Sequence, residues 1–276
     1  MSAATSRIAD RLVLAAVVVL GVVMLAPILW ALALSLKTNA ELLVDTSSAL
    51  HPPYTLENYG DIAASSSVFR WLANSLVVAT GMTLGVLALS SLAGYGFARL
   101  EFPFKRTLFV LVLFGLAVPE QAVIIPRYQL FAALDLHNTW VGLMLPGMSG
   151  PFGVFLMTQY FKAIPKEIDE AAELDGASRF RTFWRVLLPM TLPAQATLGI
   201  YTFLHAWNDY WWPLISGTNL EMYTITVGIA ASQINFAESE GLGFLMAQAL
   251  FAALPILVVY LFFQRHIVRA VSGAAA

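Results

Sequence analysis

The 276-residue sequence contains no cysteine and little charge. Without cysteine there is no disulfide framework, no thiolate nucleophile and no cysteine-ligated zinc or iron–sulfur site. Only 12% of the residues are charged, and 15 basic residues face 17 acidic ones, so no basic surface is expected for nucleic acid. The four histidines are scattered and never flank a glutamate at i, i+4, the spacing of a helical zinc site. The sequence also lacks any Gly-Lys pair, so a phosphate-binding loop for ATP hydrolysis is excluded.

Apolar residues dominate the chain, at 59% of the sequence with a mean hydropathy of +0.74. Spanning a bilayer takes about 20 mostly apolar residues, and six windows meet that length. They lie near 12–36, 72–97, 107–125, 140–160, 194–215 and 244–263. The first is longer than the roughly 7–15 apolar residues of a signal peptide, so we interpret it as a retained span. The pattern predicts an all-α polytopic membrane protein with six transmembrane helices.

The distribution of Lys and Arg predicts how the spans are oriented, because cytoplasmic loops retain basic residues. With the N-terminus inside, only Lys37, Arg70 and Arg127 face outward. The segment 218–242 carries Glu221, Glu238 and Glu240 without any Lys or Arg, which favours an external loop. Both termini are then cytoplasmic, together with twelve basic residues: Arg7, Arg11, Arg99, Lys105, Arg106, Lys162, Lys166, Arg179, Arg181, Arg185, Arg265 and Arg269.

The predicted cytoplasmic loop 161–193 contains the charged segment EAAELDGASRFRTFWRVLLP, residues 170–189. Its first helix is expected to start at Pro165, with acids in the early turns where the helix dipole favours them, and to stop at Gly176. The second is expected to begin at Ser178, an N-cap, and to end at Pro189. Its apolar positions follow a helical stripe, as in an interfacial amphipathic helix: Phe180, Phe183, Trp184, Leu187 and Leu188. From these residues alone, an ordinary solvated loop explains the segment equally well.

The same segment resembles the EAA signature of membrane subunits of ABC importers: EAA, three residues, Gly, nine residues, Ile, one residue, Leu-Pro. Val186 stands where the signature has isoleucine. The whole chain resembles the shorter of the two permeases of maltose-type carbohydrate importers. That resemblance also rests on NSLVVA at 74–79, GYGFARLEF at 94–102, NTWVGLMLP at 138–146 and WNDYWWPL at 207–214. The positions that match the signature are Glu170, Ala171, Ala172, Gly176, Leu188 and Pro189.

The resemblance implies a single transmembrane domain over 1–276 with the type I ABC importer fold, in the bacterial cytoplasmic membrane. It implies a second permease as a heterodimer partner, two copies of a cytoplasmic ATPase, and an extracytoplasmic solute-binding protein that docks on the loop 218–242. The chain itself would bind no cofactor, since ATP and Mg belong to the ATPase. The coupling helix that docks on the ATPase would present Glu170, Ala171, Ala172, Asp175 and Gly176.

Polar residues within the predicted spans are candidate pathway residues, because each is costly in hydrocarbon. Asn74 and Ser75 begin the second span. The aromatic residues around Asn208 and Asp209 in the fifth span can instead form an interfacial belt: Trp207, Tyr210, Trp211 and Trp212. Glu120 can instead cap backbone groups that Pro119 frees. Aromatic faces with carboxylates and amides suit a sugar, and the candidate set is Glu120, Gln121, Asn208, Asp209, Tyr210 and Trp211.

The predicted function is therefore a permease subunit of an ATP-driven carbohydrate importer rather than an enzyme. A glycerol-phosphate-type or polyol solute is an alternative within the same machinery. A polytopic membrane enzyme that pairs Glu120 with Asp209 is a remote alternative, and the sequence has no Gly-x-Gly-Asp to support it. A transporter working alone would usually show internal repeats of its spans, and none is evident. Gly81 and Gly85 predict close helix packing in the second span.

Overall fold

The computed structural model describes residues 3–234 and 241–273, and within those ranges every regular element is helical. Contacts along the chain divide it into two compact units. The first comprises 1–68 with 229–254, and the second 69–228 with 255–276. Each unit has its own packing, described separately below.

Three helices are long and apolar enough to cross a membrane without interruption: α1 (Ala3–Ser35), α4 (Ser66–Arg99) and α15 (Gly241–Gly273). Three further spans are bent pairs of helices. The bends measure 99° between 105–117 and 120–133, 48° between 140–149 and 151–163, and 74° between 179–190 and 192–208. Counting each pair as one span gives up to six among the described residues, the number of apolar windows, although the third pair begins inside the predicted loop 161–193.

The bent pairs are built from short helices. The first contains α5 (Lys105–Phe114), the 3-10 turns η2 (Gly115–Ala117) and η3 (Glu120–Val123), and α6 (Ile124–Ala133). The second contains α7 (Trp140–Met144), η4 (Leu145–Ser149) and α8 (Pro151–Ala163). The third contains α10 (Arg179–Thr182), a π-helical turn (Phe183–Leu187), α11 (Leu188–Met190) and α12 (Leu192–Asn208).

Proline explains why two of these spans break where they do, because it lacks an N–H and clashes with the preceding turn. Val118 and Pro119 are extended, with ψ of 116° and 132°, and Gly150, before Pro151, is extended with ψ of 113°. The predicted fifth span is also shorter than expected. It stops at Asn208, where Asp209 is extended (ψ 128°), and α13 (Trp211–Ser216) is a separate helix.

The first unit contains α1, α2 (Asn39–Val44), the 3-10 turn η1 (Thr46–Leu50), α3 (Glu57–Ala64) and the start of α15. Lys37 is 1% exposed here, and its ammonium donates to the Pro53 carbonyl at 2.8 Å. The buried Asn58 amide donates to the carbonyls of Ser35 and Lys37, and Asn39 Oδ1 accepts from Gly243 N. These bonds fix the chain just after α1 to the start of α15.

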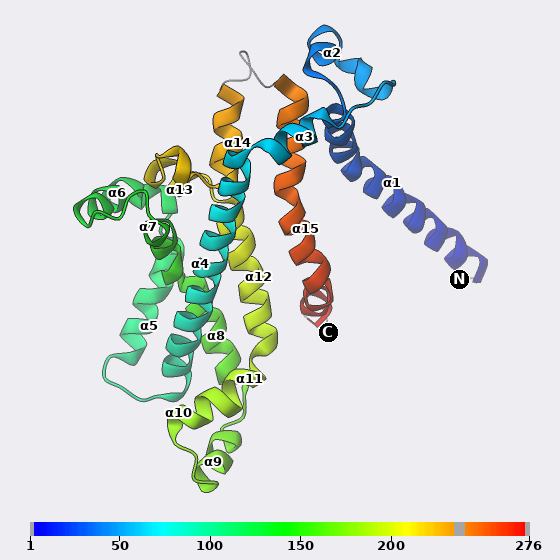
Figure 1. Cartoon of the computed structure of the whole chain (residues 1–276). Coiled ribbons are helices and arrows are strands. Elements are labelled where there is room, and N and C mark those ends of the chain that lie inside the picture. Colours follow the sequence, from blue (N-terminus) through cyan, green and yellow to red (C-terminus); the bar gives the residue numbers. More distant parts are fainter. Residues whose placement is uncertain (1–2, 235–240, 274–276) are drawn as a thin grey trace. The chain divides into compact units, whose positions relative to one another are not determined.

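The second unit places α4, α5, α8 and α12 side by side, with α9 (Glu167–Leu174), α10 and α11 at one end and α6, α7 and α13 at the other (Figure 1). Glycines on α4 allow close packing, as the sequence predicts. A Cβ added at Gly81 would overlap the Met144 side chain, and one added at Gly85 would lie 2.7 Å from Met148 Sδ. Helix α4 therefore packs directly against the second bent span.

Candidate functional site

The charged loop has the two helices that its sequence predicts, joined by a tight turn. Helix α9 carries its acids in the first turn and ends before Gly176, whose φ of +76° is the left-handed conformation that glycine favours. The Ser178 hydroxyl then accepts from Arg181 N at 3.4 Å, as an N-cap does. The second helix differs from expectation. It contains a π-helical turn and continues through Pro189 to Met190.

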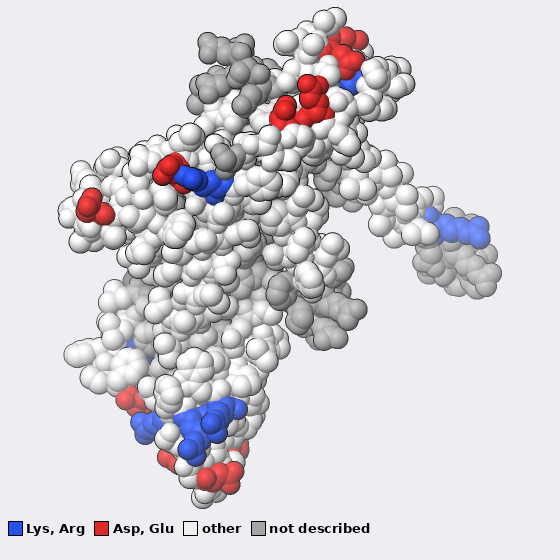
Figure 2. Space-filling view, in the orientation of Figure 1, with Lys and Arg blue, Asp and Glu red and all other residues white. Residues whose placement is uncertain are grey.

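Four of the five predicted coupling residues are exposed on this loop: Glu170, Ala171, Asp175 and Gly176. The fifth, Ala172, is only 8% exposed and packs the loop against its own chain, so its methyl group is not on the free surface. Acidic and basic side chains gather over the end of the molecule that holds this loop (Figure 2). The apolar stripe of the second helix is split, since Phe183 and Leu187 are buried whereas Phe180 and Trp184 are exposed.

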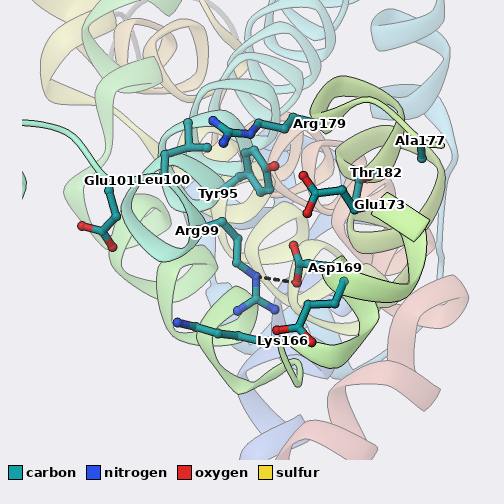
Figure 3. Close-up of a pocket in the computed structure, with 11 residues that line it drawn as sticks. Tyr95, Arg99, Leu100, Glu101, Lys166, Asp169, Glu173, Ala177, Arg179 and Thr182 are labelled. Atoms are coloured by element: carbon teal, nitrogen blue, oxygen red, sulfur yellow. Dashed lines mark ion pairs between the residues drawn. The ribbon is translucent and has the colours of Figure 1, made fainter. Parts of the chain in front are cut away.

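A buried ion pair attaches this loop to the last turn of α4 (Figure 3). Arg99 Nε lies 3.1 Å from Asp169 Oδ2, with side chains 7% and 28% exposed, and Arg99 Nη2 donates to the Ile164 carbonyl at 2.7 Å. One guanidinium thus holds both α9 and the residue that follows α8. A cavity of about 330 Å³ opens beside the pair, lined in part by Lys166, Glu173 and Arg179.

Aromatic rings add a second connection between α4 and the loop. The Tyr95 ring centroid lies 5.0 Å from that of Phe183 and 5.9 Å from that of Phe161. These three rings come from α4, the π-helical turn and α8. The sequence patterns give Arg99 only a cytoplasmic position and do not predict that Arg99 or Tyr95 contacts the loop. The sequence does place an arginine at the end of an apolar span, on the same predicted side of the membrane as an acidic loop. That arrangement is the signal that could have indicated the contact.

At the other end of the second unit, the Asn74 side chain hydrogen-bonds to backbone groups rather than facing a cavity. Its amide donates to the carbonyls of Glu221 and Tyr223 at 2.7 and 3.0 Å, and its oxygen accepts from Trp140 Nε1 at 3.0 Å. Ser75 Oγ accepts from Ile225 N at 2.8 Å. The polar pair at the start of the second span is therefore structural.

The predicted external loop 218–242 contains regular helical structure over its described part. Residues 220–225 are bonded to α4 through Asn74 and Ser75, and Trp71 Nε1 adds a bond to the Leu220 carbonyl at 3.0 Å. The 3-10 turn η6 covers Leu220–Met222, and α14 covers Ile225–Ile234. Glu238 and Glu240 lie outside the described residues.

All six candidate pathway residues line one cavity of about 510 Å³, which is within the usual range of about 300–1,000 Å³ for ligand pockets. Glu120 and Gln121 come from η3, Asn208 ends α12, Asp209 and Tyr210 connect α12 to α13, and Trp211 begins α13. Sequence analysis missed Tyr201, Leu204 and His205, which complete the wall. His205 Nε2 lies 3.9 Å from Glu120 Oε1.

Two of the three tryptophans proposed for the alternative interfacial belt are buried within the chain. Trp207 and Trp212 are buried, and Trp212 Nε1 donates to the Gly142 carbonyl at 2.9 Å. Trp211, by contrast, is 57% exposed and lines the cavity. The rings of Trp207 and Trp212 thus serve packing within the chain, and the ring of Trp211 remains open to the cavity.

The cavity wall is acidic. Its described lining includes the carboxylates of Glu120 and Asp209 and no Lys or Arg. Arg127 lies in an adjoining recess of about 30 Å³, with its guanidinium 5.4 Å from the centre of the Trp212 ring. Among the described residues, no group of three His, Asp or Glu side chains is placed to hold a metal ion. The arrangement suits hydrogen bonding to neutral hydroxyl groups.

A helical bundle with broken spans and an exposed charged loop between two of them defines a membrane component of a transport system. The chain belongs to the family of binding-protein-dependent transport system inner membrane components, whose model matches residues 87–273. This family match confirms the resemblance inferred from the EAA segment. It also confirms the prediction that the chain is a transport subunit rather than an enzyme.

Relatives match over nearly the whole chain. This chain is 32% identical to the arabinooligosaccharides transport system permease protein AraQ of Bacillus subtilis (strain 168), and the match covers 90% of this chain and 89% of that protein. It is also 32% identical to the diacetylchitobiose uptake system permease protein NgcG of Streptomyces coelicolor, covering 91% and 83%. Both relatives are named as permeases.

The fold matches a chain in a crystal structure of a bacterial ABC transporter involved in the import of the acidic polysaccharide alginate. The TM-score is 0.80 at 18% identity, over 96% of this chain and 98% of that one. At this identity the match concerns the fold alone, and it confirms the expected ABC transporter transmembrane architecture.

Proposed function

We propose that this chain is a permease subunit of an ATP-driven importer that moves a neutral carbohydrate across the bacterial cytoplasmic membrane. The observation that carries the proposal is the EAA loop, exposed at one end of the second unit and fastened to α4 by Arg99 and Asp169. The loop faces the cytoplasm and docks on an ATPase through Glu170, Ala171, Asp175 and Gly176. Ala172 supports the docking surface from beneath.

The proposed assembly has a second permease, two ATPase copies and a solute-binding protein on the outer side. ATP and Mg are bound by the ATPases. Movement of the docked loop reaches α4 through the Arg99–Asp169 pair and through the packing of Tyr95 on Phe183. Because α4 runs as one helix over 34 residues, displacement at its inner end also acts on its outer end, where Asn74 holds the 220–225 segment. The bundle alternates access in this way.

A neutral carbohydrate fits the acidic cavity better than a phosphorylated solute. The carboxylates of Glu120 and Asp209 accept hydrogen bonds from hydroxyl groups, and Tyr210 and Trp211 offer ring faces for the C–H face of a sugar. A phosphate would meet two like charges without a Lys or Arg partner in the described lining. The solutes named for the AraQ and NgcG relatives are oligosaccharides.

The test is reconstitution of the transporter in liposomes with its second permease, ATPase and binding protein. We expect ATP-dependent uptake of a neutral oligosaccharide, tried as arabinotriose and diacetylchitobiose, and none of glycerol-3-phosphate. Replacing both Glu170 and Ala171 with arginine is expected to leave the permease in the membrane but abolish uptake and co-purification of the ATPase. The matched control is the double exchange Glu57→Arg with Ala63→Arg, which alters charge on α3 outside the loop. Full retention of uptake and co-purification by the loop variant would refute the docking role.

A further inference from the structure

A second cavity, of about 280 Å³, lies where two of the broken spans meet. Both breaks contribute to its wall: Gly115 and Val118 from the 99° bend, and Gly150 and Pro151 from the 48° bend. Helix α12 supplies the opposite wall with Leu198, Tyr201, Thr202 and His205.

The backbone at these breaks indicates that the cavity holds water or solute. Val118 and Gly150 are both extended, and both line the cavity. In hydrocarbon an unsatisfied backbone polar group costs several kcal/mol, so non-helical backbone occurs at membrane depth only inside protein or along a water-filled space. Because breaks from two different spans open onto one space, a water-filled space explains them better than burial inside protein does.

The side chains around the cavity combine ring faces with hydrogen-bonding groups. The Phe152 and Tyr201 ring centroids are 5.1 Å apart, and Tyr201 and His205 are 6.1 Å apart. Glu120 lies within 3.9 Å of His205, and the described lining contains no Lys or Arg. A sugar matches this wall, because its C–H face packs on rings while its hydroxyl groups bond to carboxylate and imidazole.

The two cavities are consecutive along α12. Glu120, Tyr201 and His205 line both, so these side chains form the boundary between them. Leu198 and Thr202 lie nearer the start of α12, which adjoins the coupling loop, whereas Asn208 ends the helix in the other cavity. A solute leaving the 510 Å³ cavity along α12 towards the loop therefore enters the 280 Å³ one.

We propose that the 280 Å³ cavity at the two helix breaks is a second binding subsite for a neutral carbohydrate, with Phe152 and Tyr201 as ring contacts and Glu120 and His205 as hydroxyl contacts. This inference rests on the proposed transport function and adds a site on this chain for the solute in transit.

Gly150 offers the sharpest test. A Cβ added there meets no atom within 4 Å, and its φ of −68° suits any residue, so a side chain can project into the open space without backbone strain. Gly21 on α1 also has no neighbour within 4 Å of an added Cβ and lines neither cavity, which makes it a matched control.

The first measurement uses the natural absence of cysteine. In the reconstituted transporter, Gly150→Cys is expected to react with a charged methanethiosulfonate reagent about tenfold faster than Leu111→Cys, because charged reagents do not enter hydrocarbon. Leu111 is 58% exposed but lines neither cavity, so exposure alone does not account for the difference. The oligosaccharide that the transporter takes up is expected to slow the Gly150→Cys reaction. Equal rates at the two positions, or no protection by that sugar, would overturn the subsite.

The second measurement blocks the cavity. Gly150→Phe is expected to lower uptake about tenfold through steric exclusion, with co-purification of the ATPase unchanged, whereas Gly21→Phe transports normally. Normal uptake by Gly150→Phe would overturn the proposal. If Gly150→Phe loses the ATPase through misassembly, the cysteine reaction decides instead. A wild-type complex that neither binds ATPase nor transports sugar contradicts the broader function, and so the two failures are distinguishable.

Discussion

Arg99, the last residue of α4, contacts the EAA loop directly. Its guanidinium is almost enclosed, forms an ion pair with Asp169 and donates a hydrogen bond to the Ile164 carbonyl. Removing one member of a buried pair leaves the other charge without compensation, which typically costs about 3–5 kcal/mol. Because Asp169 retains some exposure, we expect Arg99→Ala to destabilise the assembled permease by about 3 kcal/mol, the lower end of that range, measured by thermal unfolding in detergent.

A coupling role for the same residue predicts a functional effect as well. In Arg99→Ala, ATP hydrolysis by the complex is expected to continue while solute uptake per ATP falls. The Lys105–Glu101 ion pair, which lies just after α4 and whose Glu101 side chain is 90% exposed, is a control. Glu101→Gln is expected to change the free energy of unfolding by less than about 1 kcal/mol. Unchanged uptake per ATP in Arg99→Ala would show that the pair serves packing only.

Asn74 gives a second prediction at this scale. Asn74→Ala would leave Trp140 Nε1 and the carbonyls of Glu221 and Tyr223 without their partner, and an orphaned buried polar group costs about 1–3 kcal/mol. We expect faster amide hydrogen exchange over 220–225, measured by mass spectrometry. Trp140→Phe removes only one of the three bonds and is expected to have a smaller effect. Identical exchange in all three proteins would contradict the role assigned to Asn74.

The candidate pathway residues show what sequence can predict at the level of single side chains. Polar and aromatic side chains within apolar windows identified six of the nine residues that line the 510 Å³ cavity. This pattern missed Tyr201 and His205, although their i, i+4 spacing continues to Asn208 at i+7 on one face of α12. Polarity also selected Asn74, which bonds to backbone instead. A costly polar group needs a partner, and the sequence does not specify whether that partner is solute or protein.

At the scale of elements, the turn at Gly176 sets the direction in which the second helix of the coupling loop leaves α9. Its positive φ costs a residue with a Cβ about 1–2 kcal/mol, although an added Cβ would meet no atom within 4 Å. Gly176→Ala is therefore expected to weaken ATPase co-purification through backbone strain rather than a clash. Gly176→Asn, which tolerates this conformation, is expected to retain more binding, and equal losses in both variants would contradict this cause.

The elements themselves were only partly predictable. Hydropathy windows located the spans, and turn and cap residues located the end of α9 and the start of α10, whereas α9 begins two residues after the predicted Pro165. They did not predict the 99°, 48° and 74° bends, because averaging over about 20 residues smooths a local break at Val118 or Gly150. The prolines were visible in the sequence. How sharply a broken span bends depends on what packs against it.

At the scale of the whole molecule, the orientation of the chain in the membrane remains a prediction and can be tested without removing any native thiol. On intact cells, an impermeant maleimide is expected to label Leu220→Cys and not Glu173→Cys, and permeabilised cells are expected to show both. Both side chains are exposed, so access to the residue does not limit the reaction. Labelling of Glu173→Cys from outside would place the EAA loop on the wrong side for an ATPase.

The π-helical turn at Phe183–Leu187 has a consequence for how such chains can diverge. A π turn accommodates one residue more than the α turns around it. Deleting one residue there would restore regular α winding with little rotation of the flanking turns, because the wide turn already absorbs the extra residue. The arginines of α10 would therefore keep their direction relative to the turns that follow. Descendants of a common ancestor are expected to gain or lose one residue in this stretch more easily than in a regular α turn, where the same change rotates one side of the helix by about 100°.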